Sequence, residues 1–180
     1  LAIREFGNEA ARLLRWNPFL LLRFRGCGFL RCDQLYLDQG GNPARLKRQA
    51  LCAWYVISRD MQGHTWHPPG KIIRGLQQFV AGAQVRPQDA VKLARRAGCL
   101  ATCRDPADAL WIAEGPKADH EARIADRVRR WLAEPCRWPA PGTLEVSDHQ
   151  CRQLEHALQA PLAVFTGGGG TGKSYVYTVE

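Results

Sequence analysis

The chain has 180 residues, 46% of them hydrophobic, and carries a formal net charge of +8 at pH 7. This apolar share is typical of a globular protein with a packed core, and no stretch is long and apolar enough to cross a bilayer, which excludes a membrane-spanning protein. The amphipathic N-terminal pattern lacks the apolar region and cleavage site of a signal peptide, so we expect a cytoplasmic protein. Arginine far outnumbers lysine. Because guanidinium groups bind phosphate in a bidentate manner, the charge favours a nucleic-acid partner, although an arginine-biased surface without such a partner has the same composition.

The N-terminal part of the sequence predicts two helices joined by a glycine turn. Helical periodicity over residues 3–16 ends at an Asn-Pro pair, and a short apolar run follows over residues 19–22. A second helix is predicted over residues 29–40. Gly26 and Gly28 flank a single residue between the two helical patterns, which predicts a tight helix-hairpin-helix turn.

The middle of the chain predicts a third long helix and several shorter elements. Pro43 opens this helix at its first turn, where the missing N–H costs nothing. Its buried stripe repeats at steps of four and three residues: Leu46, Ala50, Trp54, Ile57 and Met61. Beyond it the pattern predicts a loop over residues 63–70 and two short helices over 72–80 and 87–97. The two arms of a small β-hairpin are predicted over 99–101 and 110–112.

The C-terminal part begins with another helical stripe, over residues 118–132, and four arginines lie largely off this stripe: Arg123, Arg127, Arg129 and Arg130. A proline-rich stretch over residues 135–141 is the predicted linker. After it we expect a helix over residues 147–158 and a buried strand over 162–165. A glycine-rich loop over 167–172 and a further helix from about Lys173 follow. The predicted organisation is a mainly α N-terminal domain over residues 1–134, a linker over 135–145 and the start of an α/β P-loop domain over 146–180.

Cysteine and histidine spacing predicts neither a metal site nor a disulfide framework. There are seven cysteines, an odd number, and pairs such as Cys27 and Cys32 are not CxxC motifs. We therefore interpret the cysteines as buried free thiols in a reducing compartment. His64 and His67 form an HxxH motif in the predicted loop, with no third ligand nearby in the sequence, so no metal is expected there.

One eight-residue segment matches the phosphate-binding pattern GxxxxGK[ST]: Gly167, Gly168, Gly169, Gly170, Thr171, Gly172, Lys173 and Ser174. Glycines allow consecutive N–H groups to converge on phosphate oxygens. Lys173 supplies a charge to the β- and γ-phosphates, and the Ser174 hydroxyl can ligate Mg²⁺. The alternative is a flexible glycine linker that meets Lys-Ser by chance, but linkers seldom follow a buried strand directly. The segment therefore predicts that a nucleoside triphosphate binds here.

The remaining parts of an ATPase site are not predicted in this sequence. Only six residues follow Ser174, which leaves no room for a Walker B acid, a residue that orients the attacking water or the further strands of a parallel sheet. We therefore expect the chain alone to be inactive in ATP hydrolysis and interpret it as the front part of a larger protein.

Several motifs occur in one characteristic order along the chain. The first is an amphipathic region over residues 3–22, and the second is Gly26-Cys27-Gly28-Phe29. They are followed by Gly63-His64-Thr65 and then by the segments 146–150 and 163–174. The order resembles that in RecD-like superfamily 1 DNA helicases, in which an NPY-type turn, a GxGF hairpin and a GHT loop precede a glutamine motif and a TGGPGTGK[ST] Walker A loop. The resemblance is loose over residues 72–116, and Gly169 stands where the family usually has proline.

The resemblance implies an N-terminal helix-hairpin-helix region followed by the start of a RecA-like motor domain. It implies ATP and Mg²⁺ as cofactors and DNA as partner, single-stranded or at a junction of single and double strand. In the complete protein, with further helicase domains after Glu180, ATP hydrolysis would drive translocation on single-stranded DNA from 5′ to 3′.

Gln150 has two readings. By the resemblance, its side-chain amide would hydrogen-bond the adenine of ATP, which suits an amide's paired donor and acceptor. Ser147 and Gln150 also match a capping box, in which the glutamine side chain folds back onto the Ser147 N–H. Both readings stay open at this point.

The hairpin also has two readings. In the first, Arg25, Gly26, Cys27, Gly28 and Arg31 bind DNA through backbone N–H groups and positive charge, without base readout. In the second, the glycines serve only close packing at an ordinary turn between helices. A second basic patch on residues 123–130 is a further hypothesis, although a solvated helix face explains those arginines better.

The main reading is an N-terminal portion of an ATP-dependent DNA helicase. The first alternative is a non-catalytic DNA-binding module that retains a vestigial P-loop. The second alternative is a P-loop protein whose helical domain binds protein partners.

Overall fold

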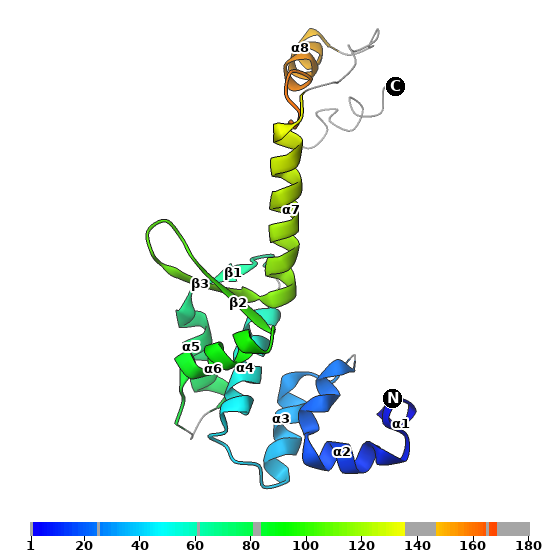
Figure 1. Cartoon of the computed structure of the whole chain (residues 1–180), viewed down its shortest axis with the longest axis vertical. Coiled ribbons are helices and arrows are strands. Elements are labelled where there is room, and N and C mark those ends of the chain that lie inside the picture. The colour runs from blue at the N-terminus through cyan, green and yellow to red at the C-terminus, as the bar shows by residue number, and fades with distance from the viewer. Residues whose placement is uncertain are drawn as a thin grey trace. The chain divides into compact units, whose positions relative to one another are not determined.

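The computed structural model describes residues 2–24, 26–60, 62–80, 84–135, 147–164 and 166–168. The described chain is mainly helical with one small antiparallel sheet, which confirms the predicted class of the N-terminal part (Figure 1). It divides into two compact units, Leu1–Asp119 and His120–Glu180. No helix among the described residues is long and apolar enough to span a bilayer.

The first unit begins with short helices: α1 (Ala2–Phe6), the 3-10 turn η1 (Gly7–Glu9), α2 (Ala10–Trp16), the 3-10 segment η2 (Pro18–Arg23) and α3 (Phe29–Asp38). The single helix predicted over residues 3–16 is wrong in one respect, because it is interrupted at Gly7. The φ angle of Gly7 is +56°, in the left-handed region that an α-helix cannot include. The predicted stop at Asn17 and Pro18 and the predicted start at Phe29 are confirmed.

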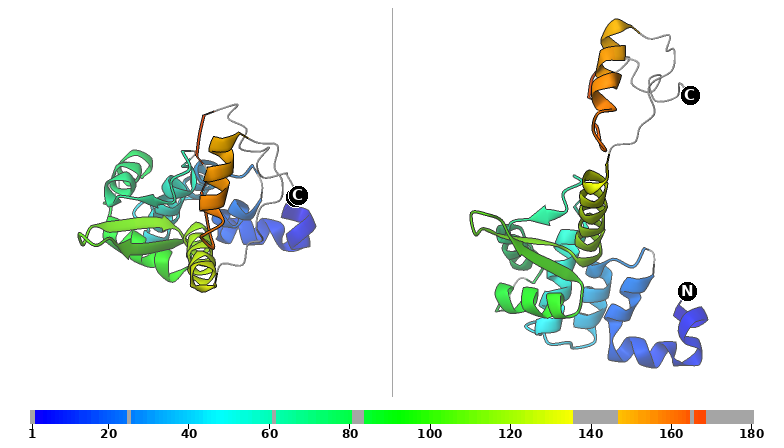
Figure 2. Two further views of the ribbon diagram at one scale, coloured as in Figure 1. Left: turned by 90° about the horizontal axis from the view of Figure 1, so that it is seen from above. Right: turned by 45° about the horizontal axis from the view of Figure 1, so that its top comes forward.

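Three helices form the centre of this unit: α4 (Leu46–Ser58), α5 (Pro69–Phe79) and α6 (Pro87–Arg96). Figure 1 and the right-hand view of Figure 2 show α4 between α3 on one side and α5 and α6 on the other. The prediction that Pro43 lies in the first turn of α4 is wrong. Pro43 precedes the helix in a turn in which the Asn42 side chain accepts a hydrogen bond from the Ala44 N–H at 2.9 Å, and this Asx turn delays the helix to Leu46.

The predicted hairpin is confirmed as strands β2 (Leu100–Arg104) and β3 (Leu110–Glu114), which pair antiparallel with Thr102 opposite Ile112. A third strand, β1 (Trp66–His67), lies in the segment that the sequence predicts as a loop. It pairs antiparallel with β3, so the strand order is β1-β3-β2. Two residues are too few to show the alternation of apolar and polar residues that predicts a strand. The strand β1 therefore forms because it pairs with β3, and its own sequence pattern does not specify it.

The hydrophobic core of the first unit lies between α3, α4, α5, α6 and the sheet. Its largest fully buried apolar side chains are Phe29, Ile57, Ile72, Leu76 and Ile112. Of the stripe predicted for α4, Ala50 and Ile57 are buried and Leu46 and Trp54 pack against the core, whereas Met61 lies outside the described residues.

Helix α7 (Gly115–Ala133) starts at the end of the first unit and continues into the second, which also contains α8 (Asp148–Ala157). The predicted helices over 118–132 and 147–158 are confirmed. The buried strand predicted over 162–165 is wrong for the residues that the structure describes, since Leu162 is 38% and Val164 82% exposed and neither belongs to a strand. A strand needs a hydrogen-bonded neighbour, and the described part of this unit contains no other strand. Residues 136–145 of the predicted linker lie outside the described residues, so the domain boundaries stay a prediction.

Candidate nucleic-acid interface and nucleotide-binding segment

The glycine turn between η2 and α3 presents an open backbone. Gly26 has a φ angle of +86°, which a side chain would strain. A Cβ atom added to Gly26 or Gly28 would meet no other atom within 4 Å, so both residues face open space. The Cys27 N–H, in contrast, donates to the Phe24 carbonyl at 3.1 Å and is already engaged. The turn therefore exposes the two glycines, and Cys27 stabilises its shape.

Arg31 lies beside this turn. Its Nη1 donates to the Gly26 carbonyl at 3.4 Å, which brings the guanidinium to the start of α3. Gly28 is the N-cap residue of α3 and has no side chain that caps the helix, so the positive end of the helix dipole is not covered there by a capping group. The structure thus brings together Arg31 and the two glycines. Arg25, the fifth predicted contact, lies outside the described residues.

Aromatic packing beneath the turn fixes where α3 begins. Phe29 is fully buried and lies between Phe19, at a ring-centroid distance of 6.0 Å, and Tyr55, at 5.2 Å. Cys32 is buried one turn further along. Burial raises the pKa of the Cys32 thiol to about 11, so it stays protonated at neutral pH, and Cys27 and Cys32 are both free thiols. The predicted free thiols are thus confirmed for the described cysteines, but the predicted burial is wrong for the exposed Cys103 and only partly met by Cys27.

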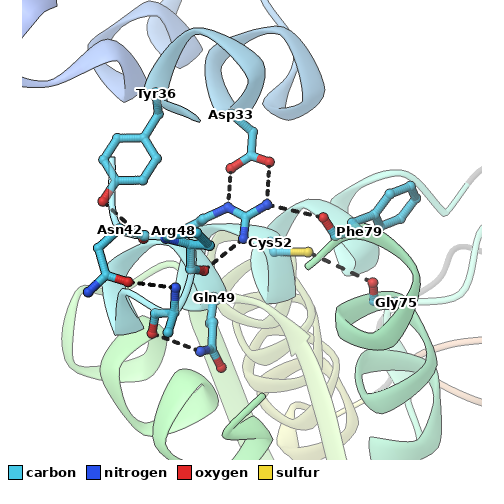
Figure 3. Close-up of polar contacts among 10 residues, drawn as sticks. Asp33, Tyr36, Asn42, Arg48, Gln49, Cys52, Gly75 and Phe79 are labelled. Atoms are coloured by element: carbon cyan, nitrogen blue, oxygen red, sulfur yellow. Dashed lines mark hydrogen bonds and ion pairs between the residues drawn. The ribbon is translucent and has the colours of Figure 1, made fainter. Parts of the chain in front are cut away.

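A buried ion pair joins α3 to α4 and α5 (Figure 3). The Arg48 guanidinium donates to both carboxylate oxygens of Asp33, with Nε–Oδ1 at 2.6 Å and Nη2–Oδ2 at 2.9 Å. It also donates to the Pro43 carbonyl at 2.8 Å and to the Phe79 carbonyl, at the end of α5, at 3.3 Å. Arg48 is 3% and Asp33 5% exposed. Four hydrogen bonds thus compensate the burial of this cation, and the helix that carries the hairpin is locked to the core.

Gln49, the next residue, is fully buried and links α4 to the segment before α6. Its Nε2 donates to the carbonyls of Ala44 and Gln84 at 3.1 and 2.9 Å, and its Oε1 accepts the Arg86 N–H at 2.7 Å. The sequence alone assigned no role to Asp33, Arg48 or Gln49. One signal was present for Asp33, which lies on the helix face of Phe29 and Tyr36 at spacings of four and three.

The HxxH histidines do not assemble a metal site with other ligands among the described residues. His67 is instead part of a partly buried cluster, in which Lys71 Nζ donates to Asp60 Oδ2 at 2.8 Å and lies 3.3 Å from His67 Nδ1. The Lys71 hydrogen bond is the main reason why the pKa of Asp60 is lowered to about 2. Burial, followed by the Lys71 charge, lowers the pKa of His67 below its usual value. The Nε2 atom of His67 lies 3.3 Å from Asp60 Oδ2 but forms no hydrogen bond with any described residue.

Part of the phosphate-binding segment lies within the described chain. Gly167 and Gly168 are exposed, and Gly169, Gly170, Thr171, Gly172, Lys173 and Ser174 lie outside the described residues. Upstream, the predicted capping box is confirmed at the start of α8. Gln150 Oε1 accepts from the Ser147 N–H at 3.1 Å, and Ser147 Oγ accepts from the Gln150 N–H at 3.3 Å. The role of Gln150 toward adenine stays a prediction.

The arginines of α7 are exposed, as expected for a solvated helix face. Arg129 pairs with Asp126 at 2.7 Å, and the Arg127 guanidinium lies 5.0 Å from the ring centroid of Trp131. The Asp126 carboxylate thus offsets the charge of Arg129, whereas the neutral Trp131 ring leaves the charge of Arg127 in place.

Two comparisons with known proteins agree on one family. Residues 2–66 match the family model for the helix-hairpin-helix domain of the ATP-dependent RecD2 DNA helicase. An ATP-dependent RecD2 DNA helicase from Deinococcus radiodurans is 29% identical over 193 aligned residues, which cover 96% of this chain and 27% of that protein. The chain therefore spans about a quarter of the length of this relative. The family match falls on α1 to β1, the part that contains the glycine turn and the Asp33–Arg48 pair. The chain is thus similar to the N-terminal region of a RecD-like helicase.

Proposed function

We propose that this chain is the N-terminal portion of an ATP-dependent DNA helicase, in which it binds DNA and contributes the first part of the nucleotide site. In the complete protein, ATP hydrolysis would drive translocation on single-stranded DNA from 5′ to 3′. The proposal is supported by the family match over the hairpin region and by the GxxxxGKS segment downstream of it.

The observation that carries DNA binding is the open glycine turn with Arg31 beside it. Gly26 and Gly28 face open space, so a phosphate group can approach the backbone closely. The start of α3 and the Arg31 guanidinium add positive charge at the same place. Such a contact reads the phosphate and not the base, so binding should be independent of sequence and sensitive to salt.

The nucleotide site rests on the sequence of the segment and on its chemistry. Glycines 167–170 and 172 and Thr171 would surround the phosphates with backbone N–H groups, Lys173 would contact the β- and γ-phosphates, and Ser174 would hold Mg²⁺. Lys173 would be the residue of this chain that acts in catalysis. Gln150 would contact the adenine, which requires its side chain to leave the capping box seen at Ser147.

Fluorescence anisotropy of a labelled single-stranded oligonucleotide, measured across a salt series, tests the DNA proposal. We expect binding at low salt, and Arg31→Gln should weaken it and lower the slope of log K against log salt by roughly 0.7. Lys92→Gln, on α6, removes the same charge from another exposed position and is the matched control. Absence of binding by the unmodified chain at low salt would overturn the proposal and favour a domain that binds protein partners.

Nucleotide binding is tested separately with Mg²⁺-ATP and the unmodified chain. We expect binding that Lys173→Ala weakens strongly, without phosphate release above background. Turnover that Lys173→Ala abolishes would contradict the expected inactivity of this chain. DNA binding together with an absence of ATP binding would favour a module with a vestigial P-loop.

A further inference from the structure

Trp16, at the end of α2, is unusually exposed for a large aromatic residue. The fraction of its surface open to solvent is 76%. The helix stops immediately after it, at Asn17 and Pro18, so no following turn covers the indole. The indole N–H groups of Trp54 and Trp111, in contrast, donate to carboxylates. Exposed indoles of this kind are common at binding surfaces, because the ring combines a large apolar face with a polar N–H.

Trp16 lies at the edge of a hollow of about 140 Å³ in the first unit, which we call the Trp16 hollow. It is lined by Trp16, Asn17, Phe19, Tyr36, Arg45 and Lys47. Phe19 and Tyr36 are buried and hold each other with ring centroids 5.3 Å apart. The Tyr36 hydroxyl donates to the Asn42 carbonyl at 3.2 Å, which fixes the position of this ring.

The remaining lining residues supply positive charge. Arg45 is the N-cap residue of α4 and Lys47 lies in its first turn, and both side chains are exposed. Within the described part of the chain, neither is engaged in a salt bridge, and the lining of the hollow contains no carboxylate. The site therefore combines three aromatic rings, an amide and two free cations.

We propose that the Trp16 hollow binds a nucleotide of single-stranded DNA, with its base stacked on the Trp16 indole and its phosphates contacted by Arg45 and Lys47. The inference rests on the proposed DNA binding and adds a contact with the base, which the glycine turn does not provide. Aromatic platforms beside cations are the usual chemistry of single-strand binding, because every base has a face that can stack. A duplex keeps its bases stacked inside, so this site selects single strands.

The hollow and the glycine turn lie along the same helix. Phe29 begins α3 next to the turn, and Tyr36 lines the hollow seven residues later. Seven residues of α-helix rise about 10 Å, which is roughly three phosphate spacings of a stacked strand at 3.4 Å each. The rise of α3 between the turn and the hollow thus corresponds to about three nucleotides of a stacked strand.

Two oligonucleotides with equal numbers of phosphates separate the two contacts. The full chain is titrated by anisotropy with oligo-dT of about fifteen nucleotides, within the usual range of single-strand sites, and with an abasic strand of the same length. The unmodified chain should bind oligo-dT more tightly than the abasic strand. Trp16→Ala should weaken oligo-dT binding by about 5- to 160-fold, the effect of losing one stacked base, and leave the abasic strand unchanged. Trp16→Phe, which keeps a ring, should retain much of the preference.

Charge variants complete the test. Arg45→Gln with Lys47→Gln should lower the salt slope by roughly 1.4, because two phosphate contacts are lost, and Lys92→Gln should leave the preference for bases intact. Arg31→Gln should weaken binding of both oligonucleotides equally, since the turn contacts only phosphate. If the unmodified chain binds both strands but Trp16→Ala changes neither, the hollow is not a base site and a protein partner is the better occupant. If the unmodified chain binds neither strand, the proposed function fails together with this inference.

Discussion

Two arginine–aspartate pairs illustrate how differently the two units are stabilised. In the first unit, the Arg48–Asp33 pair is almost completely buried, with side chains 4% and 8% exposed, and joins three helices. In the second, Arg129 and Asp126 lie three residues apart on α7 with side chains 73% and 64% exposed. The same two residue types are thus a tertiary connection in one unit and a local surface contact in the other.

The distribution of burial shows the same difference. Among the residues that the structure describes, every buried one lies at or before Ala118. The core of the first unit therefore holds the glycine turn in position through long-range contacts. In the described part of the second unit, α8 instead begins with its own capping box, an interaction within four residues. We expect the first unit to respond strongly to single substitutions and the second to respond weakly.

The largest expected effect is the loss of one partner of the buried pair. Asp33→Ala leaves the Arg48 charge buried without its carboxylate, which should reduce the free energy of unfolding by about 3–5 kcal/mol. Asp126→Ala, the matched change in the second unit, should cost at most about 0.5 kcal/mol, because exposed pairs contribute little. Urea denaturation of both variants measures the contrast. Equal effects would show that burial does not distinguish the two pairs.

Two glycines of α5 should respond with opposite signs. A Cβ atom at Gly75 would collide with the Val56 side chain on α4, so Gly75→Ala should destabilise by about 1–2 kcal/mol after its gain in helix propensity is subtracted. At Gly70 the nearest atom is the mobile end of Arg74 at 3.4 Å, and Gly70→Ala should stabilise by up to about 1 kcal/mol. Thermal unfolding of the two variants gives the signs. A stabilising Gly75→Ala would mean that α4 and α5 pack less closely than the structure shows.

The Asp60–His67–Lys71 cluster makes the stability of the first unit depend on pH. Because the pKa of His67 is lowered on folding, the unfolded chain binds a proton more readily, so stability is full above about pH 6.5 and decreases as the pH falls below it. The lowered pKa of Asp60 adds a second loss of stability, which begins below about pH 4 and continues as the pH falls through about 2. Proton NMR titration of the His67 ring should give an apparent pKa below the usual value. In denaturation at about pH 7.5 and 5.5, His67→Gln should reduce the difference in stability between the two conditions. A His67 that titrates above its usual pKa would contradict this account.

A small effect is expected at the cap of α8. Ser147→Ala removes the acceptor for the Gln150 N–H and should destabilise this helix by about 0.5–1 kcal/mol. Amide hydrogen exchange of residues 150–152 should become several-fold faster, whereas the amides of α4 should not change. Ser147→Asp keeps a capping oxygen and serves as the control. Faster exchange in α4 would show that the two units are energetically coupled.

The features that could be predicted from the sequence are those encoded over short distances. Helix ends at Pro18 and Phe29, the β2–β3 hairpin and the Ser147–Gln150 capping box all depend on residues within a few positions of one another. The order of the motifs was also sufficient to indicate the helicase family. The strand prediction is wrong for the described residues 162–164, because an apolar run specifies a strand only when a neighbouring strand pairs with it.

Tertiary structure alone determined the features that depend on distant partners. From its sequence context alone, Arg48 would be assigned to an exposed helix face, but in the fold Asp33, Pro43 and Phe79 accept its hydrogen bonds. Trp66 and His67 form a strand only because they pair with β3. Likewise, the sequence placed Trp16 at the end of a helix, but only the fold shows that its indole stays exposed beside Arg45 and Lys47. The physical reason is common to these cases: burial and charge depend on which segments meet in space, and local periodicity does not contain that information.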